Sequence, residues 1–331
     1  MSERPYIGGQ AVLEGVMMRS PVSLVVAVRR PDGRIAVREQ AWEPLVSRAW
    51  KFLRWPFVRG AVVLVESLLN GFTALSFSAE QAEPEAEGGS GERTPSRGER
   101  GLLLGASFLF MVALFIAAPH LLTLGLFKLL GHPAGMKSLA FHLVDGLFRI
   151  GILVGWLALI ARTAEAKRLF EYHGAEHKAI WTYESRLPLT VENARRFGTE
   201  HPRCGTSFLF VVVGVAVVLH IVLLPWAPVV SSVGAVQTAF VLLLKVLLAF
   251  PVAAIAYELQ KRSARPECPR ALRALVAPGR WLQRITTREP SDDQLEIALL
   301  ALERALAREE GHPRSADGVA VYPDFQGALA A

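Results

Sequence analysis

Cysteine is scarce in this sequence, and its two thiols are far apart. Cys204 and Cys268 are the only cysteines among 331 residues, and neither belongs to a C-x-x-C pair. This pattern excludes a disulfide framework and fits a reducing compartment or a membrane. The opening residues MSERPYIGGQAVLEG have no apolar run behind a basic start, so a signal peptide is not expected.

Motifs of nucleic-acid binding are also absent, although the formal net charge is +6. A basic protein could bind RNA or DNA, but no binding motif accompanies the charge here. The arginines instead flank long apolar segments, which is typical of membrane proteins. We therefore expect no nucleic-acid partner.

Charged residues are rare in four long segments, and these segments are the strongest structural signal in the chain. Each is close to the ~20 residues needed to cross a bilayer, and Pro119 predicts a bend in the first. They are residues 102–130, 139–161, 206–225 and 233–257. In the second, Asp145 and Arg149 lie four residues apart, and they either pair inside the membrane or lie in the headgroup layer.

Lysine and arginine are distributed unevenly between the connecting segments. Lys137 is the only one between the first two predicted spans and residues 226–232 contain none, whereas residues 162–203 and both termini are rich in arginine. By the positive-inside rule, the rich segments are expected in the cytoplasm. The sequence thus predicts a mainly α, multi-pass protein of the cell membrane, with about four transmembrane helices in the lipid bilayer and both termini cytoplasmic.

The apolar pattern divides the chain into four regions. They are an N-terminal cytoplasmic element (1–78), a disordered linker rich in Glu, Gly, Ser and Pro (79–100), a four-helix membrane domain (101–260) and a cytoplasmic helical tail (261–331). The membrane domain includes a cytoplasmic loop at residues 162–205. We find no internal repeat.

The N-terminal element is predicted to contain a β-hairpin and an amphipathic helix. SLVVAV and RIAVRE have the pattern of strands, and Pro31, Asp32 and Gly33 supply the turn between them. Residues 57–79 are apolar but interrupted by Arg59 and Glu66. We therefore expect them to lie at the membrane interface or to pack on other membrane helices rather than to span the membrane.

The C-terminal tail is predicted to contain a well-defined helix. Ser291 and Gln294 form a capping box, and Gly311 ends the helix. Its apolar stripe consists of Leu295, Leu299, Leu302 and Leu306. Because such a stripe needs a partner surface, a protein partner for this helix is one expectation.

The stretch EYHGAEHKAI is the most informative motif. On a helix continuing out of the second span, His173 and His177 share one face, in the i,i+4 arrangement of zinc-binding helices. Glu176 is offset from them and suits a catalytic general base acting on water beside the ion. H-x-x-E-H is the inverzincin order. The alternative is a solvated helix without metal, because short patterns also arise by chance.

The remaining metal ligands must come from downstream in the same loop. A catalytic zinc site takes three protein ligands and a structural one takes four. The sequence offers Glu184, Glu192, His201 and Cys204. We expect Glu192 or His201 to complete a site for a divalent metal, with Cys204 as the alternative. Zinc is the expected ion, and a thiolate ligand would favour it over magnesium or manganese.

Several segments resemble the YqhQ-like family of bacterial membrane proteins. They are GGQAVLEGVMMRSP, EYHGAEHKAIWTYE, LTVENARR, HPRCGTSFLF and WLQRITTREPSDDQLEIALLAL. The resemblance covers nearly the whole chain and implies a metal-dependent enzyme, which is how the family is usually described. The family pattern has glutamine where this chain has Glu171, and that difference removes no candidate ligand.

The resemblance also draws attention to two polar segments. Gln10 and Glu14, in a predicted loop with Gly8 and Gly9, are candidate substrate-binding residues, as are Arg288 and Glu289 before the capped helix. The simpler interpretation is structural, a turn in the first case and a salt bridge in the second, because buried polar groups usually satisfy one another.

Three functions compete. The first is a metal-dependent hydrolase at the cytoplasmic membrane face, acting on a lipid headgroup, a lipid-linked molecule or a nearby peptide. The second, an oxidative di-iron enzyme, needs more histidines than His173, His177 and His201 supply. The third is a non-catalytic membrane scaffold or assembly factor that uses the leucine stripe to hold a partner.

Overall fold

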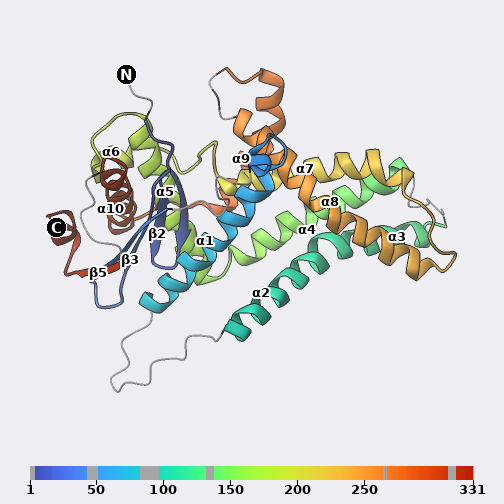
Figure 1. The fold of residues 1–331 in the computed structure, drawn as a ribbon, viewed down its shortest axis with the longest axis horizontal. Helices are drawn as coiled ribbons and strands as arrows, with labels where there is room; N and C mark the ends of the chain where they lie inside the picture. The colour runs from blue at the N-terminus through green and yellow to red at the C-terminus, as the bar shows by residue number, and fades with distance from the viewer. Residues whose placement is uncertain are drawn as a thin grey trace.

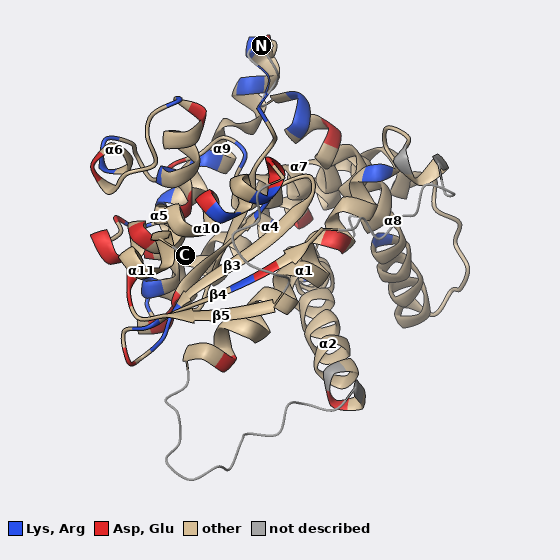
Figure 2. Ribbon diagram, turned by 60° about the vertical axis from the view of Figure 1, so that its left-hand side comes forward, with Lys and Arg blue, Asp and Glu red and all other residues tan. Residues whose placement is uncertain are grey.

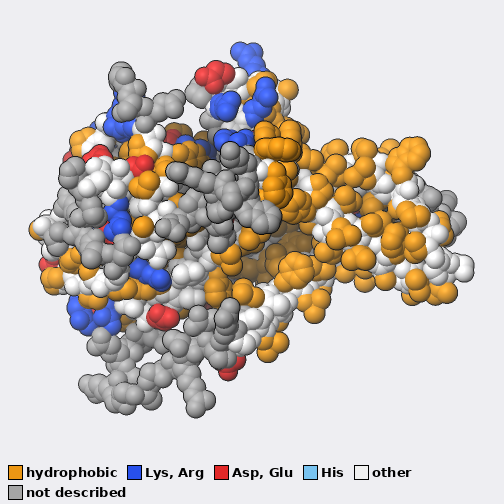
Figure 3. Space-filling view, in the orientation of Figure 1, with side chains coloured by type: hydrophobic (Ala, Val, Ile, Leu, Met, Phe, Trp, Pro, Cys, Tyr) orange, Lys and Arg blue, Asp and Glu red, His pale blue; other side chains and the backbone are white. Residues whose placement is uncertain are grey.

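The structure is a computed structural model that describes residues 4–42, 51–82, 97–131, 138–263, 265, 267–311 and 318–330. A sheet-containing end adjoins an elongated bundle of helices (Figure 1). Charged residues gather around the sheet and its neighbouring helices (Figure 2), whereas hydrophobic side chains cover the bundle (Figure 3). This separation fits a protein with one end in water and the other in lipid.

A five-stranded antiparallel sheet forms the polar end. Its strands, in spatial as well as chain order, are β1 (Gly8–Val12), β2 (Gly15–Arg19), β3 (Ser23–Arg29), β4 (Ile35–Ala41) and β5 (Gly318–Tyr322). The β3–β4 pair confirms the predicted hairpin, with Gly33 at a φ of 85° in its turn. The sequence analysis did not predict β1, β2 and β5, which are only five residues long each.

Helices cover both faces of the sheet, which explains the almost continuous apolar runs of its strands. On one face, Val25 lies in a core with residues of α5 (Ala164–Glu184) and α10 (Asp292–Glu309). On the other face, Val26 lies in a core with residues of α1 (Arg59–Ala82). Because successive strand residues point to opposite faces, neighbours such as these enter different cores.

Helix α10 has the predicted start, and its leucines are covered by the chain itself. Ser291 and Gln294 form the capping box. Leu295, Leu299 and Leu302 are buried in the core with the sheet and α5, and Leu306 packs against it. The stripe therefore does not need a separate protein, which removes the basis for the expected partner of this helix. Short helices α6 (Val191–Arg195) and α11 (Phe325–Ala330) also contact α10.

The helical bundle contains the four predicted spans. Its segments are α2 (Arg97–Val112), a π-helical turn η2 (Ala113–Ala117), α3 (Ala118–Leu129), α4 (Leu139–Ile160), α7 (Gly205–Leu223), a 3-10 turn η3 (Leu224–Trp226) and α8 (Gly234–Ser263). The π-helical turn lies just before Pro119, which lacks an N–H and clashes with the preceding helical turn. A π-helical turn within a continuous helix thus lies next to Pro119, where the bend was predicted.

Helix α1 is apolar but is placed differently from the other long helices. Together with the four spans it is long and apolar enough to cross a membrane by length and composition. At its start, Arg59 forms an ion pair of 2.6 Å with Glu258, in the final part of α8. Towards its end, Ala74 and Phe77 pack on the sheet. The start of α1 therefore lies beside the end of α8, and its later turns lie on the sheet. The 3-10 turn η1 (Lys51–Arg54) precedes it.

The sheet determines how many helices cross the bundle. Strands β1–β4 precede the spans and β5 follows them, yet β4 pairs with β5 in one sheet. Helix α5, between the second and third spans, packs on that same sheet. The chain must therefore cross the bundle an even number of times between β4 and α5, and an even number of times between α5 and β5. The run α2–α3 with α4, and α7 with α8, satisfy this requirement.

The two ends of the predicted linker, residues 79–100, are helical in the structure. Residues 79–82 complete α1 and residues 97–100 begin α2. The predicted disorder of residues 83–96 lies outside the described residues. The membrane domain and the C-terminal tail are joined through α9 (Arg270–Thr286), which packs along α7 with Gly279 against the Ser207 backbone.

The topology predicts which introduced cysteines share one side of a membrane. Cysteines at Glu80 and Glu192, both exposed at the sheet end, are expected to react with a membrane-impermeant maleimide from the same side, and Val230→Cys from the opposite side. Both native cysteines are buried and give little background. If Glu80→Cys reacts from the same side as Val230→Cys, and Glu192→Cys reacts from the other side, then α1 spans the membrane.

A buried ion pair joins β4 to α10 and generates a stability prediction. Arg304 Nη1 lies 3.3 Å from Glu39 Oε1, and both side chains are at most 1% exposed. Arg304→Ala leaves the carboxylate of Glu39 poorly paired, so we expect a loss of about 3 kcal/mol in the free energy of unfolding. Arg196→Ala, which removes an exposed ion pair with Glu192, is the matched control and should change stability little. Denaturant unfolding in detergent measures both, and equal effects would contradict the prediction.

Candidate metal centre

The histidine helix begins with a turn rather than as a continuation of the second span. Helix α4 ends at Ile160, and Thr163 caps α5 by accepting a hydrogen bond from the Ala166 N–H. The expected single helix is thus broken at residues 161–163. The break lets α5 pack along the sheet and brings its middle turns beside the start of α7.

Both histidines of the motif are oriented by backbone carbonyl groups, each of which lies against the Nδ1 atom of the ring. His173 Nδ1 lies 2.8 Å from the Thr286 carbonyl oxygen, and His177 Nδ1 lies against the Thr199 carbonyl oxygen. A carbonyl only accepts, so each Nδ1 carries a proton and donates it, and in the neutral ring this leaves the lone pair on Nε2. His177 Nε2 is buried and makes no hydrogen bond of ordinary geometry, and the side chain that interacts with this ring is Cys204. Zinc-binding histidines are oriented by second-shell acceptors in the same way.

Cys204 supplies the third atom of this group. It is the N-cap of α7, and its Sγ accepts a hydrogen bond from the Thr206 N–H at 3.3 Å. Negative charge on sulfur is favoured at this position by the helix dipole. His173 Nε2 lies 3.2 Å from Cys204 Sγ. The potential ligand atoms of His173, His177 and Cys204 all lie within 4.8 Å of one another, so they could bind one ion.

Glu176 lies beside this group and is not part of it. Its carboxylate accepts a hydrogen bond from the Ala11 N–H of β1. It lies so close to β1 that a Cβ on Gly9 would be 2.6 Å from Glu176 Cγ. Burial raises the pKa of Glu176, and the nearby His173 and His201 oppose that effect. Gly9 is therefore in a strand rather than in the predicted loop, and its missing side chain makes room for the acid.

The two preferred third ligands do not reach the cluster. Glu192 lies on the outside of α6 with its side chain 81% exposed, and it pairs with Arg196. Helix α6 is short and buries only Ala194 against the rest of the protein, so Glu192, in its first turn, faces solvent. The expectation for Glu192 is therefore wrong in this structure, and the alternative, Cys204, takes its place.

His201 is close to the cluster but faces another group. Its ring lies 5.6 Å from that of His177 between centroids, and its Nε2 lies 3.6 Å from Glu184 Oε2. Burial lowers the pKa of His201 to about 4, so the imidazole is neutral at pH 7. Glu184 itself pairs with Arg203. His201 and Glu184 thus border the site rather than complete the ligand set.

The predicted substrate-binding residues of the N-terminal segment have structural roles. The Gln10 amide lies against Gly71 of α1, on the face of β1 opposite to Gly9 and Glu176. Glu14, in the β1–β2 turn, forms an ion pair with Arg168 and accepts a hydrogen bond of 3.3 Å from the Tyr172 hydroxyl. Both residues fasten the sheet to helices, but only Glu14 lies in a turn, because Gln10 is part of strand β1.

Arg288 and Glu289 also fasten segments together. The Arg288 N–H donates to the Phe170 carbonyl at 2.9 Å, and Glu289 forms an ion pair with the buried Lys178. These contacts hold the strand-like segment after α9 against α5. The segment contributes to the site through its backbone, since the carbonyl that orients His173 belongs to Thr286.

Gln283 is a site residue that the sequence analysis did not single out. Its amide group is completely buried and connects three backbone or side-chain groups: it accepts from the His201 N–H at 2.8 Å and donates to the His201 carbonyl and to Ser207 Oγ, both at 2.7 Å. It thereby fixes the loop before Cys204. A glutamine on an amphipathic helix gives no sequence signal for such a role.

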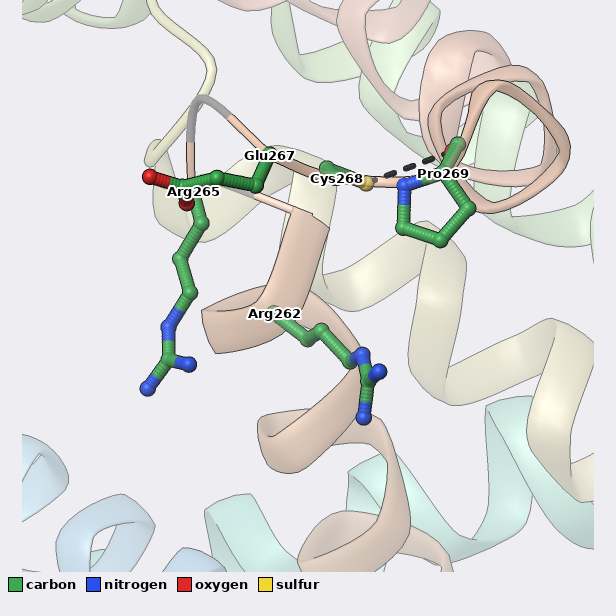
Figure 4. Close-up of a pocket in the computed structure, with 5 residues that line it drawn as sticks. All are labelled: Arg262, Arg265, Glu267, Cys268 and Pro269. Atoms are coloured by element: carbon green, nitrogen blue, oxygen red, sulfur yellow. Dashed lines mark hydrogen bonds between the residues drawn. The ribbon is translucent and has the colours of Figure 1, made fainter.

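The junction of α8 and α9 contains a shallow pocket with no comparable chemistry. It is lined by Arg262, Arg265, Glu267, Cys268 and Pro269, and the Cys268 thiol donates to the Pro269 carbonyl at 3.4 Å (Figure 4). The two arginine side chains extend away from the thiol in this view. No group of potential ligand atoms was found here among the described residues.

These features define an integral membrane protein whose spans support a polar end with a His-His-Cys cluster, in which His177 and Cys204 are buried and His173 is partly buried. Residues 55–308 match the family described as "Protein of unknown function (DUF1385)", and the chain belongs to this family. It is 33% identical over 318 residues to "Uncharacterized protein YqhQ" of Bacillus subtilis (strain 168), covering 92% of this chain and 93% of that protein. The resemblance inferred from the sequence is thus confirmed. No solved structure matches the chain.

The packing around Gly174 generates a prediction for the site. A Cβ at Gly174 would lie 2.0 Å from the Arg288 carbonyl oxygen, a backbone atom that cannot move alone. Gly174→Ala should therefore push the segment after α9 away from α5, at a cost of about 1–3 kcal/mol. Gly198→Ala is the matched control, because nothing lies within 4 Å of a Cβ there. Unfolding measurements on both variants test this, and equal stability would contradict it.

Proposed function

We propose that this protein is a zinc-dependent membrane enzyme, a hydrolase that works at the cytoplasmic membrane face. The observation that carries the proposal is the convergence of three ligand atoms with their protons already assigned. His173 and His177 each direct an unprotonated Nε2 towards the region of Cys204 Sγ, because each Nδ1 donates to a backbone carbonyl. An ordinary polar helix has no reason to orient both rings in this way.

The donor set favours zinc over harder ions. Imidazole nitrogen and thiolate sulfur are ligands that zinc prefers, whereas magnesium and calcium prefer oxygen. Three protein ligands leave a fourth position of a tetrahedral site open, which is typical of catalytic rather than structural zinc. A zinc ion with an open position activates water or polarises a carbonyl group for hydrolysis.

Glu176 is the proposed general base. Glu176 precedes His177 directly in α5, so its carboxyl group lies on the same helical turn. It is not a member of the ligand group. Its pKa is raised by burial, which moves it towards the operating pH as expected for a catalytic acid or base. The hydrogen bond from the Ala11 N–H restricts its rotation. Glu176 can thus accept a proton at a fixed place beside the cluster.

The surroundings of the cluster support a substrate at the membrane surface. Cys204 starts the span α7, and α9, which packs on α7, exposes Leu275 and Trp281 beside several arginines. A helix with exposed apolar and basic residues suits the interface between lipid and water. The arginine-rich sheet end is proposed to be cytoplasmic by the positive-inside rule. The proposed substrates are a lipid headgroup, a lipid-linked molecule or a membrane-proximal peptide.

The proposal predicts the metal content of three variants. Wild-type protein purified without chelator should contain about one zinc per chain, and His177→Ala should lose it, because two ligands hold zinc poorly. Glu176→Gln should keep the zinc, since Glu176 is outside the ligand group, and should lose hydrolysis once a substrate is found. Elemental analysis measures the metal.

Glu192→Gln is the matched control for the second variant and should keep the zinc as wild type does, because its side chain points to solvent. Loss of zinc from Glu176→Gln as complete as from His177→Ala would make Glu176 a ligand and overturn its role as base. Absence of any transition metal from wild-type protein reloaded with zinc would leave the scaffold as the function.

A further inference from the structure

Besides His142, five buried ionisable side chains lie inside the helical bundle, within the spans and apart from the candidate metal centre. They are His120 of α3, Asp145 and Arg149 of α4, His220 of α7 and Lys245 of α8. None is more than 4% exposed. We refer to these five residues as the membrane charge cluster. Ionisable groups at such positions are costly and are usually retained for a function.

Asp145 is the centre of the membrane charge cluster. Its Oδ1 lies 2.6 Å from Lys245 Nζ, and its Oδ2 lies 3.2 Å from Arg149 Nη2. The predicted pairing of Asp145 with Arg149 is thus confirmed, but Lys245 was not expected to share the carboxylate. His120 Nδ1 lies 3.1 Å from Lys245 Nζ, and His220 Nδ1 lies 3.5 Å from Arg149 Nη1.

The charges of the membrane charge cluster do not balance. It contains one carboxylate against one ammonium and one guanidinium group, so with neutral histidines one positive charge is in excess. The spans that the structure describes contain two other acids, Glu99 in the first turn of α2 and Glu258 in the final part of α8. Glu258 is already paired with Arg59. No described acid within these spans is therefore placed to neutralise the excess charge.

The membrane charge cluster also has more hydrogen-bond donors than acceptors. Lys245 can only donate, so His120 Nδ1 accepts and the proton of this neutral ring is on Nε2. That Nε2 is buried and has no partner, and neither has Arg149 Nε, which always carries a proton. Two buried donors therefore lack an acceptor. Buried donors are rarely left unsatisfied in proteins.

We propose that the membrane charge cluster binds one small monovalent anion, a halide or a carboxylate. Such a ligand corrects both imbalances, since it brings one negative charge and several acceptor sites. The Asp145–Arg149 pair lies within α4, so it holds no second helix, and the link from α4 to α8 is made by Lys245. Lys245 adds a second cation at a position where its desolvation is costly. This inference is independent of the proposed zinc enzyme, whose ligands come from other elements.

The test is the anion dependence of thermal stability of the full-length protein in detergent, at constant ionic strength. Replacing methanesulfonate, which is neither a halide nor a carboxylate, by chloride, and separately by acetate, should raise the melting temperature of wild type with saturation, because a ligand that binds only the folded state stabilises it. The two anions distinguish a halide site from a carboxylate site. Calorimetric titration with the effective anion gives its affinity.

Two variants change the charge of the membrane charge cluster in opposite directions. Lys245→Met removes the excess charge and should reduce the anion affinity at least roughly tenfold, the ratio that corresponds to losing one modest charged contact. Asp145→Asn adds to the excess and should raise the affinity. Lys128→Met, at the end of α3 and outside the cluster, is the matched control and should bind as wild type does.

The order of affinities decides the inference even if one variant fails to fold. The site is supported if Asp145→Asn binds the anion more tightly than wild type, or if wild type binds it more tightly than Lys245→Met. No stabilisation of wild type by either anion overturns it, and so does an equal effect in Lys245→Met, which would place the anion elsewhere. Zinc content measured in the same samples should not change, so failure of this inference leaves the metal proposal intact.

Discussion

The pairing of β4 with β5 is the constraint on which the rest of the structure depends. It joins residues 35–39 to residues 318–322, across all of the spanning helices. Because the first strands and the last strand share one sheet, the chain must return to the same end after its membrane segments. The same sheet provides the surface on which α5 and α10 are buried. A helix carrying His173 and His177 would otherwise have no fixed position relative to the membrane.

The candidate metal centre is assembled from three chain segments that meet at this surface. Helix α5 brings the two histidines, the start of α7 brings Cys204, and the segments around Thr199 and Thr286 bring the carbonyls that orient the rings. Gly9 and Gly174 allow a strand and a backbone carbonyl to approach α5 closely. The site therefore depends on packing between elements that are distant in sequence, as expected for a geometry that must hold to a fraction of an ångström.

Two buried polar groups in this protein show opposite imbalances. At the candidate metal centre, Nε2 of the neutral His177 ring is an acceptor, which suits a cation. In the bundle, the unpaired atoms of His120 and Arg149 are donors, which suits an anion. The distinction comes from the neighbours: backbone carbonyls fix the imidazole protons in the first case, and Lys245 fixes one in the second. The protein thus combines a site proposed for zinc with one proposed for an anion, separated by much of the bundle.

Local patterns in the sequence determined the elements of this protein. The scarcity of charge over about twenty residues predicted the four spans, turn residues around Gly33 predicted the β3–β4 hairpin, and Ser291 with Gln294 predicted the start of α10. Spacing of four placed His173 and His177 on one face. These signals can be read from the sequence because hydrogen bonds and burial within one element repeat at short, fixed intervals.

Tertiary structure alone decided which elements meet. It selected Cys204 rather than Glu192 as third ligand, kept α1 at the sheet end, covered the leucine stripe with the chain's own sheet, and added Lys245 to Asp145. Short strands such as β1 and β5 form only because neighbours across the sheet supply their hydrogen bonds. Such contacts join residues up to hundreds of positions apart, and their energy depends on a common packed geometry that no local repeat encodes.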